Sequence, residues 1–204
     1  MLKCVFLVPI DHRGIQGKLI KNYLALQSWC DRNNAQIVTV NGLFLNFARN
    51  YLATGGKGFV DTSPPPAEWL FWIDSDVDFS IEQVEYMMAL PDDKKFVAGW
   101  YHMPFTSVEW LEKLGEEEPN KLVEVDWCGF GFVKMHRSII EQMKYPYFPL
   151  NQVTIEGCDD RKGGTFELND LSFEDVSFCR NCYEATKIKP LVVPKIRVPH
   201  LKSF

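Results

Sequence analysis

The strongest chemical signal in the sequence is a row of three aspartates, Asp74, Asp76 and Asp78, directly after the segment EWLFWI at residues 68–73. Side chains two positions apart in an extended chain lie on the same face. Asp74 and Asp76 are therefore expected to point together, joined by Asp78 if the chain stays extended. Carboxylates this close repel each other unless a cation neutralises them, and hard divalent metals take oxygen ligands. The segment predicts a metal site, unless the aspartates are only turn and cap residues before a helix at Ser80.

A second pair of acids, Glu174 and Asp175, follows Ser172 and Phe173 at the start of an expected helix. One of these carboxylates could act as the general base that takes a proton from an acceptor hydroxyl. The alternative is a helix cap with acids matched to the helix dipole. A capping role would lower the carboxylate pKa and make it a poorer base, so the environment of Ser172 matters.

Two further features could contribute to a site. His200 follows the last expected strand, and as a ligand beside carboxylates it would favour a manganese-like ion over magnesium, although a lone histidine is more often a surface residue. In the segment DWCGFGF at residues 126–132, the glycines permit close backbone approach and the aromatics could stack on a sugar or base. A tight turn between core strands is the alternative.

Cys179 and Cys182 form a CxxC without a second pair at zinc-site spacing, so we interpret them as structural thiols.

The elements that must position these residues alternate between strand and helix in the first half of the chain. Short apolar segments predict strands at residues 3–9, 36–40, 68–73, 96–100, 122–126, 130–135 and 191–198. Helical spacing or caps predict helices over residues 17–33 and 43–54, after a Ser80–Gln83 capping box, and over 136–143 and 172–186. Residues 101–121 are expected to be irregular with a short helical piece, and residues 144–171 to be a long loop region. Pro194 places the last strand at an edge of the sheet.

This order predicts an α/β fold with a mostly parallel sheet and helices on both faces. In such folds, ligands bind beyond the carboxyl ends of the strands. Residues 9–13, 41–42 and 74–78 should therefore share one rim.

Composition limits the class of protein. The 204 residues are 46% hydrophobic, with 22 Lys plus Arg against 27 Asp plus Glu and a net charge of −5. This composition excludes disorder, suits one domain and argues against binding to nucleic acid through phosphate contacts. No stretch approaches the roughly 18–20 apolar residues of a transmembrane segment. Six cysteines are too sparse for a disulfide scaffold. We expect a soluble protein in a reducing compartment, the cytoplasm.

Taken together, the order of these features resembles the GT-A nucleotide-sugar glycosyltransferases, in particular small family-2-like enzymes of bacteria and of large viruses or phages. The resemblance runs from about Val5 to His200. It implies a GT-A-like, Rossmann-related α/β/α sandwich in one domain, with a nucleotide-binding half at 1–100 and an acceptor-side half at 101–204. It also implies a UDP- or GDP-sugar donor, Mn²⁺ or Mg²⁺, and a glycan, lipid or protein acceptor. The location would be the host cytoplasm if the protein is viral. Because the sequence ends four residues after His200, the resemblance fits either a minimal enzyme or one domain of a longer protein.

The resemblance also implies residue roles. Donor-binding positions would be Pro9, Asp11, Arg49, Asn50, Asp74, Ser75, Asp76, Trp127 and Gly129. Metal ligands would be Asp76, Asp74, Asp78 and His200, with the DxD register open between Asp74/Asp76 and Asp76/Asp78. Asp175 would be the base of an inverting reaction, with Glu174 as the substitute, and a retaining mechanism stays open.

Two other functions remain open on the sequence. A metal-dependent nucleotidyltransferase also needs paired carboxylates, and the loop at residues 11–18 contains the glycines and basic residues that such an enzyme would use. A non-catalytic sugar-binding module derived from a transferase is the second alternative. The product distinguishes them: nucleoside diphosphate from a glycosyltransferase, pyrophosphate from a nucleotidyltransferase, and neither from a binding module.

Overall fold

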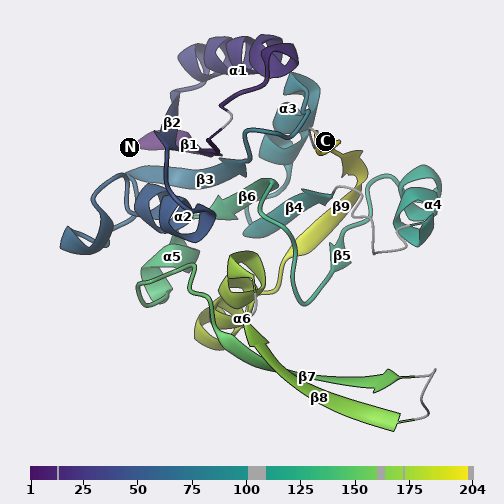
Figure 1. Cartoon of the computed structure of the whole chain (residues 1–204). Coiled ribbons are helices and arrows are strands. Elements are labelled where there is room, and N and C mark those ends of the chain that lie inside the picture. Colours follow the sequence, from purple (N-terminus) through teal and green to yellow (C-terminus); the bar gives the residue numbers. More distant parts are fainter. Residues whose placement is uncertain (13, 101–108, 160–163, 172, 202–204) are drawn as a thin grey trace.

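A sheet of seven strands in the order β2-β1-β3-β6-β4-β9-β5 forms the centre of the protein in a computed structural model that describes residues 1–12, 14–100, 109–159, 164–171 and 173–201 (Figure 1). The strands are β1 (Leu2–Ile10), β2 (Ala35–Asn41), β3 (Ala67–Ile73), β4 (Phe96–Trp100), β5 (Val123–Glu124), β6 (Phe132–His136) and β9 (Leu191–Arg197). Strands β2, β1 and β3 pair in parallel, as do β4 and β9, and β6 is antiparallel to both β3 and β4. Five strands therefore run in one direction and only β6 and β5 oppose them, which confirms the mostly parallel α/β sheet.

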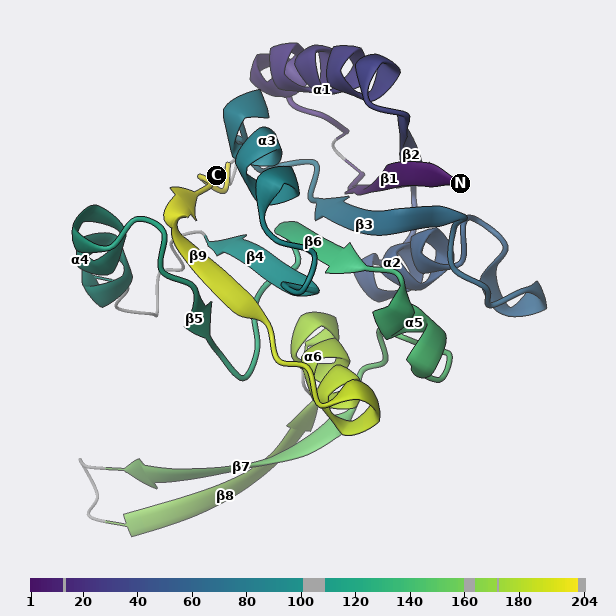
Figure 2. The same ribbon diagram turned by 180° about the vertical axis from the view of Figure 1, so that it is seen from behind.

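Helices cover both faces of this sheet. The helices are η1 (Gly17–Leu19), α1 (Ile20–Arg32), α2 (Leu45–Ala53), η2 (Gly58–Val60), α3 (Ile81–Ala89), α4 (Glu109–Glu117), α5 (Ser138–Gln142) and α6 (Glu174–Thr186). Figures 1 and 2 show α1 and α3 on one side of the sheet and α2, α5 and α6 on the other.

The side chains of β1 and β3 explain the two layers. Phe6 and Phe71 pack with α1 and α3 in one apolar core, whereas Leu7 and Trp72 pack with α2, α5 and α6 in another. Successive side chains of a strand point to opposite faces, so a strand that is covered on both sides must be apolar throughout. This is why β3 is apolar without interruption from Trp69 to Ile73, and why it ends where the aspartates begin.

Local signals set the ends of two helices beside the site. Ser80 accepts a hydrogen bond from the Gln83 backbone N–H, and the Gln83 side chain accepts one from the Ser80 N–H, which confirms the capping box at the start of α3. Helix α2 ends before Gly55 and Gly56, which both have positive φ angles. Glycine adopts this left-handed backbone without steric cost, so the chain leaves the helix there.

The expected loop over residues 144–171 is wrong. Strands β7 (Gln152–Asp159) and β8 (Gly164–Leu171) form an antiparallel hairpin, which is a separate two-stranded sheet that extends away from the rest of the molecule (Figure 1). A hairpin outside the central sheet does not need the continuous apolar sequence of a core strand. The apolar pattern therefore gave no signal for it.

The expected edge position of the last strand is also wrong. Strand β9 lies between β4 and β5, although β5 pairs only with Leu191 and Val192. Pro194 follows these two residues and falls where the register between β4 and β9 shifts. A proline lacks the N–H that a regular ladder uses, and a bulge tolerates it inside a sheet.

Within the described residues, no helix is both long enough and apolar enough to cross a membrane.

Candidate functional site

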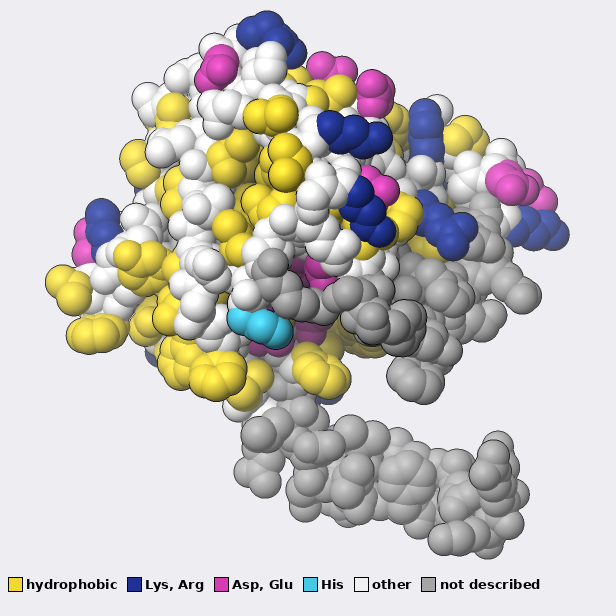
Figure 3. All heavy atoms as spheres, turned by 45° about the horizontal axis from the view of Figure 1, so that its top comes forward, with side chains coloured by type: hydrophobic (Ala, Val, Ile, Leu, Met, Phe, Trp, Pro, Cys, Tyr) yellow, Lys and Arg dark blue, Asp and Glu magenta, His cyan; other side chains and the backbone are white. Residues whose placement is uncertain are grey.

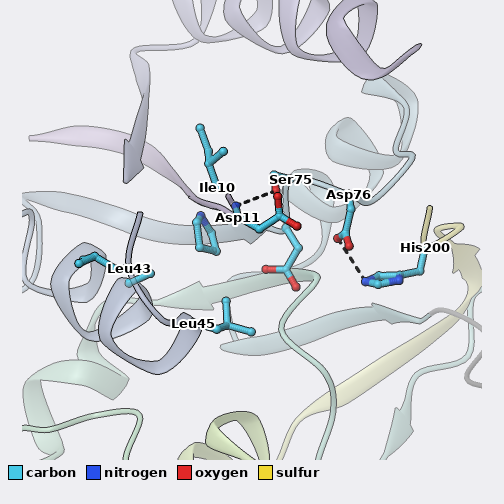
Figure 4. A pocket seen from close by; sticks show the side chains of 10 residues that line it. Ile10, Asp11, Leu43, Leu45, Ser75, Asp76 and His200 are labelled. Atoms are coloured by element: carbon cyan, nitrogen blue, oxygen red, sulfur yellow. Dashed lines mark hydrogen bonds and ion pairs between the residues drawn. The ribbon is translucent and has the colours of Figure 1, made fainter. Parts of the chain in front are cut away.

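A pocket of about 310 Å³ lies at the carboxyl ends of β1 and β3 (Figure 4). Its walls are formed by Pro9, Ile10, Asp11, Leu43, Leu45, Ala48, Asp74, Ser75, Asp76 and His200. The parallel strands bring these residues together because their carboxyl ends meet at the same edge of the sheet, as the sequence predicts. Figure 4 shows Leu43 and Leu45 on one side of the pocket, and Asp76 and His200 on the other.

The side chains of the three aspartates after β3 contact three different partners. The Asp74 N–H donates to the Gly131 carbonyl at 3.0 Å, and the Val77 N–H donates back to the Asp74 carbonyl at 3.2 Å, so the chain turns instead of staying extended. Ser75 and Val77 are buried between the partly exposed aspartates. Asp74 and Asp76 line the pocket, whereas Asp78 accepts a hydrogen bond from Asn22 Nδ2 at 2.8 Å and does not line it.

Asp74 is held by a buried arginine. Arg49 is 2% exposed, and its Nη2 donates to Asp74 Oδ2 at 3.1 Å while lying 3.0 Å from Oδ1. The Arg49 Nε also donates to Glu174 Oε1 at 3.3 Å. This one side chain therefore joins the end of β3 to the start of α6, so the predicted DxD and ED segments belong to one charged cluster.

Burial shapes the protonation of this cluster. Burial acts most strongly to lower the pKa of Arg49, but the carboxylates of Asp74 and Glu174 outweigh it, so the pKa is raised and the guanidinium stays charged. The pKa of Asp74 is raised, chiefly because burial penalises its charged form, and Asp76 adds to this by repulsion. Arg49 acts in the opposite direction on Asp74 without cancelling the effect of burial.

Asp76 and His200 lie next to each other on one wall of the pocket (Figure 4). His200 Nε2 lies 3.2 Å from Asp76 Oδ1. The backbone holds the two segments in place, since the Leu201 N–H donates to the Asp76 carbonyl at 2.7 Å and the Asp78 N–H donates to the Pro199 carbonyl at 2.8 Å. A residue near the carboxyl end of the sequence is thereby fixed beside the turn after β3.

The two acids at the start of α6 have different surroundings. Glu174 is buried and tied to Arg49, whereas the Asp175 Oδ1 accepts a hydrogen bond from the Val176 N–H at 2.7 Å. The pKa of Asp175 is raised, mainly by burial and then by the negative charge of Glu174. The lowering that a capping role would cause is therefore not seen at Asp175. Ser172, the expected cap, lies outside the described residues.

Asn50 was predicted to bind the nucleotide, but its side chain bonds to buried backbone. Its Oδ1 accepts from the Tyr147 N–H at 2.7 Å and the Phe148 N–H at 3.0 Å, and its Nδ2 donates to the Phe148 carbonyl at 3.0 Å. Asn50 does not line the pocket. These contacts fix the segment after α5 against α2.

The remaining predicted residues divide between the pocket and its surroundings. Pro9 and Asp11 line the pocket, and the Asp11 N–H donates to Ser75 Oγ at 3.4 Å. Trp127 is half-exposed and lines a different hollow, beside α6, and Gly129 is partly buried in the segment before β6. The fold therefore brings Pro9, Asp11 and the DxD segment together in the pocket. Trp127 lies at a different hollow, although Gly131 of the same Gly-aromatic segment bonds to Asp74.

Sequence reasoning assigned no role to four apolar pocket residues, Ile10, Leu43, Leu45 and Ala48, although Ile10 falls within the rim expected at residues 9–13. All four lie within or next to the rim and helix segments that the sequence indicated. Apolar side chains carry no chemical signal of their own, so only their position after β1 and β2 could have suggested them.

The donor atoms in the pocket fit a divalent metal. Asp76 offers a carboxylate oxygen and His200 an imidazole nitrogen on the same side, and Asp74 Oδ1 is buried without a hydrogen-bond donor among the described residues, although Arg49 lies near it. In the part of the chain that the structure describes, no group of three or more His, Cys, Asp or Glu is arranged to hold a metal by itself. Such a set suits an ion that takes its other ligands from substrate phosphates and water.

Comparisons with known proteins identify the fold. No protein-family model and no curated protein matches the sequence. Among solved structures, A197 from STIV is similar over 99% of this chain and 87% of its own, with a TM-score of 0.57 and 17% identity. GalNAc-T7, solved with UDP, GalNAc and Mn²⁺, is similar over 100% of this chain but only 44% of its own, with a TM-score of 0.56 and 10% identity. At such identities the likeness concerns the fold alone, and this chain has the GT-A-like fold that the sequence predicts.

Proposed function

We propose that the chain is a metal-dependent glycosyltransferase that moves a sugar from a nucleotide-diphosphate sugar to an acceptor hydroxyl. The observation that carries the proposal is the pairing of Asp76 with His200 in a pocket at the carboxyl ends of β1 and β3. A carboxylate and an imidazole on one wall suit Mn²⁺ better than Mg²⁺. GalNAc-T7, which has the same fold, was solved with UDP, GalNAc and Mn²⁺, and this supports a nucleotide-sugar donor.

The chain's own residues then have distinct tasks. Asp76 and His200 would hold the metal, and Pro9, Ile10 and Asp11 would contact the nucleoside part of the donor. When bound, the metal would supply positive charge that stabilises the departing diphosphate. Arg49 would position Asp74 and Glu174 through its buried ion pairs. Residues 1–100 would form the nucleotide side and residues 101–204 the acceptor side. His200 is the exception, because it would contribute to the nucleotide side.

Asp175 is the better candidate for the base. Glu174 is engaged by Arg49, whereas the Asp175 carboxylate has a raised pKa and is more effective at accepting a proton near neutral pH. In this proposal Asp175 removes the proton from the acceptor hydroxyl as its oxygen attacks the anomeric carbon. Attack opposite the leaving diphosphate would invert the configuration.

A thermal-shift panel tests the proposal. UDP, GDP, nucleoside triphosphates and nucleotide sugars would be added singly to the full chain, each with and without Mn²⁺. A ligand that binds only the folded state stabilises it by about 2.7 kcal/mol at a hundredfold excess over its dissociation constant. We expect a Mn²⁺-dependent shift with one nucleoside diphosphate and its sugar.

The products separate the alternative functions. Release of nucleoside diphosphate from the donor supports the glycosyltransferase. Release of pyrophosphate from a triphosphate would instead indicate a nucleotidyltransferase. Sugar-dependent stabilisation without either product would indicate a non-catalytic binding module, and the absence of every shift would contradict the proposal.

A further inference from the structure

Helix α2 exposes an apolar face to solvent. Phe44, its N-cap residue, is 80% exposed, Phe47 is 61% exposed and Tyr51 is 40% exposed. Their spacing of three and four residues places them along one side of the helix. The opposite side, with Leu52 and Ala53, is buried in the core. A helix that is apolar on two faces is normally covered on both.

The segment after α2 extends this face. Phe59 and Val60 of η2 are both 83% exposed, and Gly56 and Gly58 lie against the Tyr51 ring, so η2 adjoins the exposed side of α2. We call the continuous surface the apolar ridge; it consists of Leu43, Phe44, Leu45, Phe47, Tyr51, Phe59 and Val60. Figure 3 shows hydrophobic side chains gathered at the lower left, over α2 and the segment that follows it.

The high exposure of these side chains indicates that the ridge protrudes from the surface and does not line a groove. A side chain that lines a groove is partly covered by its neighbours, whereas Phe44, Phe59 and Val60 are nearly as exposed as in an unfolded chain. A protein partner would need a pocket that matches each protruding group. The interface of a lipid bilayer is fluid and accepts protruding aromatic and aliphatic groups without a matching shape.

Charge favours the same occupant. The 29 residues from 32 to 60 contain no Asp or Glu, although the whole chain has 27 of them in 204 residues. Lys57 is the exposed charge in the segment between Phe47 and Val60, and it pairs with Asp61 at 2.6 Å. Asp61 directly follows Val60 but is neutralised by Lys57, so the ridge segment brings no unpaired carboxylate toward lipid phosphates, which would repel it.

We propose that the apolar ridge inserts into the interface of a phospholipid bilayer. Leu43 and Leu45 belong to the ridge and also line the pocket, so insertion would place the pocket beside the headgroups.

Vesicle flotation tests the insertion without nucleotide or metal. The full chain would be mixed with vesicles of phosphatidylcholine and phosphatidylglycerol, and the bound fraction measured at increasing lipid. The double variant Phe59→Ser, Val60→Ser lies outside the pocket, and its folding is checked by circular dichroism. Ile20→Ser with Leu24→Ser removes exposed apolar groups of α1, away from the ridge, and serves as the matched control.

We expect the wild-type chain and the α1 control to float with the vesicles, and the η2 variant to lose about tenfold or more in apparent affinity. Failure of the wild-type chain to float, or equal loss in both variants, would overturn the proposal. Concentration-dependent dimers that the η2 variant abolishes, without flotation, would assign the ridge to a second copy and also overturn it. The nucleotide panel without vesicles is independent, so flotation without nucleotide binding would refute the proposed function and leave the ridge assignment intact.

Discussion

Arg49 Nη2 lies 3.0 Å from Asp74 Oδ1, and this contact connects the helix after β2 to the turn that carries the pocket carboxylates. The same guanidinium reaches Glu174 at the start of α6. The buried Arg49 guanidinium has lost its contacts with water and makes two ion pairs in their place. The geometry of the pocket therefore depends on a residue that does not itself line it.

We expect Arg49→Met to destabilise the protein strongly. Removing one member of a buried pair leaves an uncompensated buried charge, which costs about 3–5 kcal/mol. Urea unfolding monitored by tryptophan fluorescence would measure the free energy of unfolding.

Two comparisons make this measurement specific. Lys57→Met breaks the exposed Lys57–Asp61 pair and should leave the unfolding free energy unchanged within error. Adding Asp74→Asn to Arg49→Met removes one of the two stranded carboxylates and should recover part of the loss. If Arg49→Met behaves like Lys57→Met, the buried pair does not hold the site together.

Asn50→Ala should destabilise the protein by about 3 kcal/mol or more, because three buried backbone groups lose a partner at a cost of about 1–3 kcal/mol each. The affected groups are at Tyr147 and Phe148. Asn120→Ala, which removes an exposed amide that accepts only a 3.4 Å contact from Tyr86, is the control. A variant that keeps its stability but loses nucleotide affinity would instead favour the donor-binding role that the sequence resemblance implies for Asn50.

The site could be predicted where the sequence changes character sharply. Strand β3 is apolar on both faces and ends in aspartates, so both the strand and the position of Asp74 at its carboxyl end follow from residue types. The partners could not be predicted. Arg49 lies 125 residues from Glu174, and Asn22 lies 56 residues from Asp78. Such contacts depend on how the layers pack, which local patterns do not encode.

The fold shows the same limit in its second half. Hairpin β7–β8 is held by its own ladder outside the central sheet, so the apolar periodicity that identifies core strands had nothing to detect. Pro194 indicated an edge because a proline lacks a ladder donor. The structure instead accommodates it at a register shift between β4 and β9.

Asp76 belongs to both DxD registers, so comparing its replacement with that of Asp78 would settle which register holds the metal. Asp76→Asn should abolish the Mn²⁺-dependent part of the nucleotide thermal shift, because this carboxylate faces His200 in the pocket. Asp78→Asn should keep the shift, because Asp78 bonds to Asn22 outside the pocket lining. Both variants remove one negative charge at neighbouring positions, so each controls for the other. Loss of the shift in Asp78→Asn as well as in Asp76→Asn would move the metal ligands to the second register, Asp76/Asp78.

Asp175→Asn should lower the rate of nucleoside diphosphate release by about 10²–10⁴-fold if Asp175 is the base. Only the deprotonated carboxylate can accept the proton, and burial with the charge of Glu174 raises its pKa. In the wild-type enzyme the acid limb of kcat should therefore lie above the pH at which an ordinary aspartate titrates, and the variant should lose this limb. Glu174→Gln removes the negative charge that pairs with Arg49 and should reduce stability more than it reduces the rate.

The pH dependence of stability tests the raised pKa of Asp175 independently of the rate. A folded-state pKa above the unfolded value means that the folded protein holds its proton more tightly, so this contribution to stability is complete below the unfolded pKa. It is lost as the pH rises through the folded pKa. Asp175→Asn cannot lose it, so the variant should gain stability relative to wild type as the pH rises through this window, and should match it at lower pH. Urea unfolding at a series of pH values measures this difference. A constant difference at all pH values would mean that Asp175 titrates normally, and would remove the physical reason for preferring it as the base.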